Sequence, residues 1–258
     1  MAILSVEKVS KVYPSHSKKG EPVLALQEVS MEVQKNEFCS ILGHSGCGKT
    51  TLLNMIAGFE ACTKGQILCA GSPVTKPGAD RSMVFQDYAL FPWLTVYDNI
   101  AFGLRLKTSK VGSEDPKIMH LIELVGLTRF AHHYPHQLSG GMRQRVSIAR
   151  ALAVDPTVLL MDEPFAALDA QNRSMMQQEM IRILNEESKT VVLVTHSIEE
   201  AINLSDVIVV MTRRPGRVKA TIRVPRPRQM AEESDEYQAL KNRIRDLISN
   251  EQDLSDIT

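Results

Sequence analysis

One stretch decides the fold of this chain: residues 43–50 read Gly43-His44-Ser45-Gly46-Cys47-Gly48-Lys49-Thr50. It fits the pattern G-x-x-x-x-G-K-[ST], in which glycines let backbone N–H groups approach phosphate oxygens. An alternating apolar run over 37–42 precedes the stretch and a helix-like run over 51–58 follows it. A phosphate-binding loop needs that context, because the N-terminus of the following helix adds partial positive charge. The sequence therefore predicts a nucleoside triphosphate site.

Two side chains of this loop carry chemistry of their own. Lys49 is expected to neutralise the β- and γ-phosphates, and the Thr50 hydroxyl is expected to ligate Mg²⁺. The alternative, a glycine-rich turn that fits the pattern by chance, leaves the flanking strand and helix unexplained. The predicted nucleotide-binding residues of this stretch are Gly43, His44, Ser45, Gly46, Cys47, Gly48, Lys49, Thr50 and Thr51.

The composition is that of an ordinary globular protein. The chain has 258 residues, 43% of them hydrophobic, which suffices for one large or two modest domains with a buried core. Thirty Lys and Arg residues balance thirty Asp and Glu residues. Since no bulk positive field would attract a polyanion, we predict no nucleic-acid partner.

Neither the cysteines nor the N-terminus indicate export. The four cysteines include no C-x-x-C pair, which argues against a zinc site and a disulfide framework and favours reduced thiols. The first residues lack a basic region followed by a sustained apolar segment, and nowhere do 18 apolar residues run together. We therefore expect a chain that neither crosses a membrane nor carries an export signal.

Hydrophobic periodicity predicts strands that alternate with helices. The predicted strands cover 3–13, 24–33, 65–71, 82–86, 157–163, 190–196, 207–211 and 218–224, the last two as a hairpin. The predicted helices cover 143–154, 174–185 and 238–250, and a helical insertion covers 95–127. Such an order is typical of an α/β protein, whose ligands bind outside the carboxyl ends of the strands.

Polar side chains stand at several of those strand ends. Asp162 and Glu163 follow four consecutive apolar residues, and we predict that Asp162 holds Mg²⁺ while Glu163 positions the attacking water. Gln86 and His196 can reach a metal, a water or the nucleotide in the same way. Taken alone, however, Gln86 fits a solvated loop residue better and His196 fits a helix cap better.

Two further segments offer contacts to a nucleotide. Ser139-Gly140-Gly141 opens a predicted helix and forms a second candidate anion site, with an ordinary N-cap as the alternative. Tyr13 ends the first predicted strand, where its ring can stack on a purine. Taken alone, Tyr13 fits a packing residue at the strand edge better than a stacking residue.

The segment 90–94 gathers apolar residues around the chain's only tryptophan, Trp93. Such a patch is either the core of a subdomain or a docking surface for a partner. Three histidines, His132, His133 and His136, follow later without the spacing of a metal site, so we interpret them as surface residues.

In order along the chain, these motifs resemble those of the ATP-binding subunit of an ABC (ATP-binding cassette) transporter across residues 1–224. After the phosphate loop come Gln86 as the Q-loop, 138–142 (Leu-Ser-Gly-Gly-Met) as the signature, 158–163 as the Walker B strand, 167–169 as the D-loop and His196 as the H-loop. The resemblance implies an α/β fold: a P-loop NTPase (RecA-like) core with an N-terminal antiparallel β-subdomain and an inserted α-helical signature subdomain. It implies an ATP-binding domain over 1–228, with the helical subdomain at 88–150, and a charged helical tail over 229–258.

The resemblance also implies residue roles. Tyr13 would stack on adenine, and Asp169 would contact nucleotide from the D-loop. Ser139, Gly140 and Gly141 would bind the ATP held by a second subunit. The implied metal ligands are Thr50, Gln86 and Asp162, and the implied catalytic residues are Glu163, His196, Lys49 and Gln86. Two positions depart from the family pattern, Met142 where Gln is usual and Ala166 where Gly is frequent.

Three short segments, 78–81, 91–95 and 213–217, are similar to the nitrate, sulfonate and taurine importers of this family. That likeness implies import of a small anion, with ATP and Mg²⁺ as cofactors, at the cytoplasmic face of the inner membrane. The implied partners are transmembrane permease subunits, a substrate-binding protein indirectly, and a second copy of the chain or a paralogous ATPase. At its length the chain is expected to lack the regulatory β-domain of the sugar importers.

Other classes of protein share part of this pattern. A phosphate-loop kinase or GTPase does not need Ser139-Gly140-Gly141, and no Asn-Lys-x-Asp guanine reader is present. A soluble ABC ATPase of DNA repair or translation is the stronger alternative. The repair type is expected to separate Lys49 from Ser139 by a long coiled coil, which this chain does not have, and the translation type usually carries two cassettes.

Overall fold

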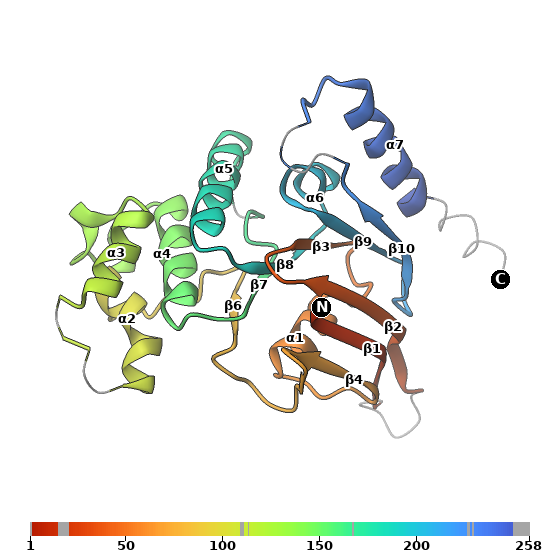
Figure 1. The fold of residues 1–258 in the computed structure, drawn as a ribbon, viewed down its shortest axis with the longest axis horizontal. Coiled ribbons are helices and arrows are strands. Elements are labelled where there is room, and N and C mark those ends of the chain that lie inside the picture. The colour runs from red at the N-terminus through yellow and green to blue at the C-terminus, as the bar shows by residue number, and fades with distance from the viewer. Residues whose placement is uncertain are drawn as a thin grey trace. The chain divides into compact units, whose positions relative to one another are not determined.

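The structure, a computed structural model, describes residues 2–14, 21–108, 111–112, 114–166, 168–225, 228 and 230–249. The chain folds as two units, drawn in Figure 1. One unit comprises Met1–Pro77 and Thr190–Thr258, and the other comprises Gly78–Lys189. The second unit is therefore an insertion between two sequence segments of the first.

The first unit contains a four-stranded antiparallel sheet with the order β2-β1-β4-β5. Its strands are β1 (Ala2–Tyr13), β2 (Val23–Gln34), β4 (Lys64–Cys69) and β5 (Ser72–Pro73). In β2 the buried residues Val29, Met31 and Val33 alternate with the exposed residues Ser30 and Glu32. This period of two gives the strand one buried face, as the sequence predicts.

The same unit contains strands that are buried along their whole length. β3 (Phe38–Leu42) lies between β8 (Thr190–Thr195) and β9 (Val207–Met211) and runs parallel to both. β10 (Val218–Arg223) pairs with β9 in antiparallel fashion, so the predicted hairpin is confirmed. Burial on both faces explains why β3, β8 and β9 read as nearly continuous apolar runs.

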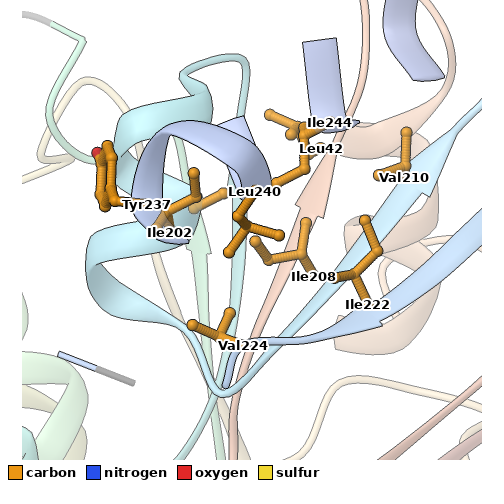
Figure 2. Close-up of a cluster of buried hydrophobic side chains, with 10 residues drawn as sticks. Leu42, Ile202, Ile208, Val210, Ile222, Val224, Tyr237, Leu240 and Ile244 are labelled. Carbon is orange, nitrogen blue, oxygen red and sulfur yellow. The ribbon is translucent and has the colours of Figure 1, made fainter. Parts of the chain in front are cut away.

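The described part of this unit also contains the helices α1 (Lys49–Ala57), α6 (Ile198–Leu204) and α7 (Asp235–Ser249). α7 packs on α6 and β9, and Lys241 on α7 forms an ion pair of 2.7 Å with Glu199 on α6. Figure 2 shows the apolar cluster beneath α7. Its buried members are Leu42, Ala201, Ile202, Ile208, Val210, Ile222, Val224, Tyr237, Leu240 and Ile244.

The second unit pairs two parallel strands, β6 (Arg81–Val84) and β7 (Val158–Asp162). Helices α2, α3 and α4 of this unit pack on one another (Figure 1) and bury residues that include Ile100, Leu121 and Val146. Its helices are α2 (Val96–Lys107), α3 (Pro116–Leu124), α4 (Gly140–Ala153) and α5 (Ala170–Glu186), with the short 3₁₀ turns η1 (Thr128–Phe130) and η2 (Pro135–Gln137).

Polar side chains set the starts of α2, α3 and α4. The side-chain oxygens of Thr95, Asp115 and Ser139 accept hydrogen bonds from main-chain N–H groups in the first turn, at 3.1, 3.0 and 3.3 Å. Pro116 stands at the first position of α3, where its missing N–H costs nothing. These signals divide the predicted helical insertion over 95–127 into two helices.

Several elements begin or end elsewhere than the sequence predicts. α4 begins at Gly140 rather than Arg143, and α5 begins at Ala170 rather than Ser174. Their first turns are small or polar, so they carry no apolar period that would reveal a helix. β6 ends at Val84, two residues before Gln86, because its pairing with β7 ends there.

Some predictions fall on residues outside the described ranges. These are most of the loop over 14–22, Ala167 of the D-loop, and the end of the chain from Asn250 onward. None of the helices in the part of the chain that the structure describes has both the length and the hydrophobicity needed to cross a bilayer. The domain boundaries at 88–150 and 228 stay a prediction.

Candidate functional site

The phosphate loop connects β3 to α1 by a left-handed path. Gly46 has φ 77° and Gly48 has φ 101°, and a Cβ on Gly48 would lie 2.6 Å from Leu26 Cδ2. Only glycine is compatible with both the dihedral angle and the close approach at position 48. α1 begins directly after it, so the N–H groups of its first turn have no partner within the helix. The loop and the helix start therefore have a geometry that suits an anion.

Lys49 is buried beneath this loop. Its Nζ donates to the carbonyl oxygens of Gly43 at 2.8 Å and His44 at 2.9 Å, and 5% of the residue is exposed. The ammonium thus lies at the centre of the loop, within reach of any phosphate bound there. Thr50 is exposed in the first turn of α1. The two side chains that sequence reasoning singled out therefore stand together.

Tyr13 lies at the end of β1 and contacts the start of α1. Its hydroxyl donates to Glu60 Oε2 at 2.6 Å and lies 3.5 Å from Thr51 Oγ1. The Lys11 ammonium pairs with the same Glu60 oxygen at 3.2 Å and stands over the Tyr13 ring, 5.0 Å from its centroid. These contacts fix the ring beside the phosphate loop.

The electrostatics of this cluster follow from its contacts. Burial and the hydrogen bond to Glu60 raise the pKa of Tyr13. Burial also works against the charge on Glu60, but hydrogen bonds from Tyr13 and Lys11 outweigh it and hold the pKa of that carboxyl below its ordinary value. Glu60 was missed from the sequence, because nothing marks a partner 47 residues from Tyr13.

The turn between β9 and β10 packs on the outside of the phosphate loop. A Cβ on Gly216 would lie 2.1 Å from the Cys47 carbonyl oxygen, and the Arg214 guanidinium donates to the Gly46 carbonyl at 3.3 Å. The main chain of Gly216 is itself held by hydrogen bonds of 2.9 Å from its N–H to Ala25 and from Gln27 to its carbonyl. The sequence predicts segment 213–217 as the turn of this hairpin and likens it to the anion importers, but it does not predict the contact with the phosphate loop.

His196 follows β8 at the edge where the phosphate loop leaves β3. Leu42 pairs with Thr195 in the parallel ladder, so Gly43 and His196 leave adjacent strands at the same level. The Thr195 hydroxyl donates to Glu200 at 2.6 Å and accepts from the Ser197 N–H at 3.0 Å. His196 is exposed on this fixed turn.

In the second unit, β6 and β7 bring three predicted residues to one edge. Val84 pairs with Met161, so Gln86 and Glu163 both lie two residues beyond that pair, with Asp162 between Met161 and Glu163. Glu163 has φ 43°, a left-handed value that is uncommon for a side-chain-bearing residue and is often found at functional sites. The exposed amide of Gln86 and the two half-buried carboxylates are thus clustered by the strand register.

The signature residues line a pocket of about 480 Å³ in the same unit. Ser139, Gly140 and Gly141, which form the N-terminal end of α4, line this pocket together with Asp169. The sequence does not predict that two further charged side chains, those of Arg145 and Glu179, line this pocket. The complete lining is Ser139, Gly140, Gly141, Met142, Arg145, Leu168, Asp169, Met175, Met176 and Glu179.

Contacts within the unit hold both of these charged side chains in place. Arg145 donates to the Val125 carbonyl at 3.0 Å. Glu179 pairs with Arg182 at 2.7 Å, and hydrogen bonds from that guanidinium hold the pKa of the Glu179 carboxyl below its ordinary value. The N-terminus of α4 and the Arg145 guanidinium attract negative charge in this hollow, whereas the carboxylates of Asp169 and Glu179, which line it too, oppose it.

The apolar segment around Trp93 is an exposed aromatic patch rather than a core. Trp93 is 70% exposed, and its ring centroid lies 5.7 Å from that of Phe91, which in turn lies 4.5 Å from Phe102. The fully buried Asn99 side chain holds the segment in place, through hydrogen bonds to the main chain of Phe91, Leu94 and Thr95. We name Phe91, Trp93 and Phe102 the aromatic patch.

The histidines near this patch have aromatic partners. His133 packs edge-on against Phe130 at 5.1 Å between centroids, and His136 stacks on Tyr134 at 5.9 Å. His132 is exposed. Aromatic packing therefore explains the positions of two of the three histidines that a metal site here would need as ligands.

Comparisons with known proteins agree with this arrangement. The family profile described as ABC transporter matches residues 26–166. A taurine import ATP-binding protein of Roseobacter denitrificans is 48% identical over 206 residues, which is 80% of this chain and 77% of the relative. A nitrate import ATP-binding protein of Synechococcus elongatus is 40% identical over 247 residues, which is 93% of this chain and 89% of the relative.

The fold is also that of solved cassettes. A dimeric ATP-binding cassette bound to ADP and Pi in a post-hydrolysis state superposes with a TM-score of 0.74 at 32% identity, over 86% of this chain and 99% of that one. The predicted α/β P-loop fold is thereby confirmed. The chain belongs to the ABC transporter family, as an ATPase of its ATP-binding cassette type.

Proposed function

We propose that this chain is the ATP-hydrolysing subunit of an importer that carries a small anion of the nitrate, sulfonate or taurine type. Two chains would face each other head to tail and drive a separate permease. The likeness to taurine and nitrate import ATP-binding proteins supports the substrate class. The observation that carries the dimer is the signature pocket, a hollow of about 480 Å³ where the N-terminal end of α4, with Ser139, Gly140 and Gly141, lies beside Asp169.

The groups around the phosphate loop bind the nucleotide. Lys49 neutralises the β- and γ-phosphates, the loop's main-chain N–H groups bind phosphate oxygens, and Tyr13 packs on the adenine ring. The oxygen donors of Thr50, Gln86 and Asp162 suit Mg²⁺, a hard cation that prefers oxygen ligands. Bound there, Mg²⁺ supplies positive charge that offsets the charge of the phosphates.

Hydrolysis is assigned to groups at the strand ends. Glu163 orients water in line with the γ-phosphate and polarises it, and His196 holds the γ-phosphate and that water. Lys49 stabilises the charge that spreads over the γ-phosphoryl oxygens in the transition state. Gln86 links this centre to the segment that carries the aromatic patch, which follows it within a few residues.

Each ATP would be bound by two chains. The phosphate loop of one chain holds it from one side, and Ser139, Gly140 and Gly141 of the other chain contact the γ-phosphate, with Asp169 beside them. The hydroxyl oxygen of Ser139 accepts a hydrogen bond of 3.3 Å from the Met142 N–H, so the hydroxyl proton is available to a phosphate oxygen. Met142, where the family usually has Gln, leaves these donors in place.

The aromatic patch is the surface we assign to the permease. Trp93 and its neighbours expose apolar area on a segment that Asn99 fixes, which is what a rigid docking surface requires. The chain would then lie on the cytoplasmic face of the inner membrane as a peripheral subunit, and meet the substrate-binding protein only indirectly. Within it, we propose an ATP-binding domain over 1–228 with the helical part at 88–150.

The test is affinity capture of a tagged Glu163→Gln chain from native membranes in the presence of ATP. The variant is expected to retain ATP and so to keep its complex assembled. Recovery of a multi-span permease together with a binding protein would support the proposal, and the ligand of that binding protein would name the substrate. Recovery of soluble chains or ribosomes alone would contradict it in favour of a non-transport ABC ATPase.

A further inference from the structure

In the first unit, α7 packs on the same apolar cluster as the end of β3, from which the phosphate loop begins. Tyr237, Leu240 and Ile244 of α7 are buried in the same cluster as Leu42, the residue directly before Gly43 (Figure 2). Ile248, one turn further along α7, packs against this cluster. The end of α7 is thereby brought to the point where β3 becomes the phosphate loop.

A hydrogen bond joins the two elements there. His44 Nε2, from the second residue of the loop, lies 3.2 Å from the main-chain carbonyl oxygen of Ile248. Because a carbonyl only accepts, the ring nitrogen must be the donor. Ile248 lies in the last turn of α7, whose carbonyls have no N–H partner within the helix, so the His44 ring caps the helix end.

His44 is therefore held on two sides. Its main-chain carbonyl accepts from Lys49 Nζ at 2.9 Å, and its side chain is held by α7. A phosphate in the loop competes for the Lys49 ammonium and weakens the first contact. The contact with α7 does not involve the ammonium, so it continues to fix residue 44 while the nucleotide binds.

We propose that His44 is a positioning residue through which α7 preorganises the phosphate loop, so that ATP binding and the docking of α7 are coupled. The proposal rests on ATP binding at this loop, as put forward above. Coupling between two binding events is reciprocal: if docked α7 raises ATP affinity by some factor, ATP stabilises docked α7 by the same factor. α7 then acts as a regulatory element, since whatever displaces it lowers nucleotide affinity.

The first measurement is the ATP dissociation constant of the full chain, by equilibrium binding in EDTA so that no hydrolysis follows. His44→Leu removes the donor and is expected to weaken ATP binding about three- to tenfold, the worth of one hydrogen bond. His44→Gln keeps an N–H donor at similar reach and is expected to restore most of the affinity. His132→Leu, at an exposed histidine of the other unit, is the matched control and should bind ATP like the wild type.

The second measurement is amide hydrogen exchange in α7, with and without ATP. The wild type is expected to exchange more slowly in this helix when ATP is bound, by about the factor measured in affinity, and His44→Leu is expected to lose that protection. Equal ATP affinity in His44→Leu and wild type, or equal losses in the Leu and Gln variants, would overturn the coupling. A wild type that fails to bind ATP would instead overturn the proposed function.

Discussion

Replacing Gly216 by alanine would place a methyl carbon 2.1 Å from the Cys47 carbonyl oxygen of the phosphate loop. It would also lie 2.9 Å from Leu26 Cδ2 and 3.0 Å from Met211 Cε, which are side-chain ends that can shift, whereas the Cys47 oxygen belongs to the main chain of the loop. Gly216 cannot withdraw, because hydrogen bonds to Ala25 and Gln27 hold its main chain on both sides. The phosphate loop is therefore the part that must yield.

The size of the effect follows from the distances. Bringing the contact from 2.1 Å to the 3.0 Å that real Cβ atoms respect requires a displacement of about 0.9 Å. A misplacement near 1 Å in a catalytic site can cost about 10²-fold in rate. Overpacking of this kind costs about 1–3 kcal/mol of unfolding free energy, which leaves a domain of ordinary stability folded. We expect Gly216→Ala to lower kcat/KM for ATP about 10²-fold while the chain stays folded.

The assay is steady-state ATP hydrolysis beside a thermal unfolding curve for each variant. Gly112→Ala is the control, because a Cβ there meets no atom of the described residues within 4 Å and should leave hydrolysis unchanged. Wild-type kcat/KM in a folded Gly216→Ala chain would refute the claim that this turn positions the phosphate loop. Loss of folding without a change in the activity of the folded fraction would refute it equally.

Four further predictions address the site, the partner and the last helix. Lys49→Ala should weaken ATP binding about 10–100-fold, the worth of a charged hydrogen bond, and unchanged affinity in a binding titration would exclude Lys49 as a phosphate ligand. Glu163→Gln should slow turnover roughly 10²–10⁴-fold with ATP binding retained, and normal turnover would remove Glu163 from the mechanism. Trp93→Ala should leave ATP hydrolysis of the isolated chain intact but lower the amount of substrate transported per ATP in the assembled importer. An unchanged ratio of transport to hydrolysis in vesicles would contradict a role of the aromatic patch in coupling. Burial, with Glu232 and Glu199 nearby, raises the pKa of Tyr237 from 10.0 to about 12. The unfolded chain therefore loses this proton at lower pH than the folded chain, and stability present below pH 10 declines up to pH 12. The Tyr237→Phe variant should not show this decline, which amounts to roughly 2–3 kcal/mol of unfolding free energy measured by chemical denaturation. Parallel pH profiles of stability in the variant and the wild type would contradict the burial argument.

Local patterns made much of the fold predictable. The phosphate loop stands between a buried strand and a helix because glycines, Lys49 and flanking apolar runs are close in sequence. The same holds for the strand ends at Asp162 and His196, since parallel pairing needs only the order of apolar runs. Helix starts were less predictable, as at Ala170, where the first turn is polar.

Contacts between distant segments were not predictable from the residues. Nothing in the sequence pairs Tyr13 with Glu60, places Gly216 against Cys47, or directs the His44 ring to the end of α7. Such contacts depend on which surfaces the strands and helices bring together, and no periodicity encodes that. The role of Asp169 was inferred from the family resemblance alone. In the structure Asp169 lines the signature pocket together with Arg145, whose place there the sequence does not predict.

The central claim, that each ATP is bound between two chains, is tested most directly by mixing two defective chains in a Glu163→Gln background. One carries Lys49→Ala, which impairs the phosphate loop. The other carries Gly141→Asp, which puts a carboxylate into the signature at a position where a Cβ meets no atom within 4 Å among the residues that the structure describes. Neither chain alone should retain ATP through gel filtration, whereas the mixture should retain about one ATP per two chains, because a head-to-tail pair rebuilds one intact site. A mixture that retains no more ATP than the separate chains would contradict the account.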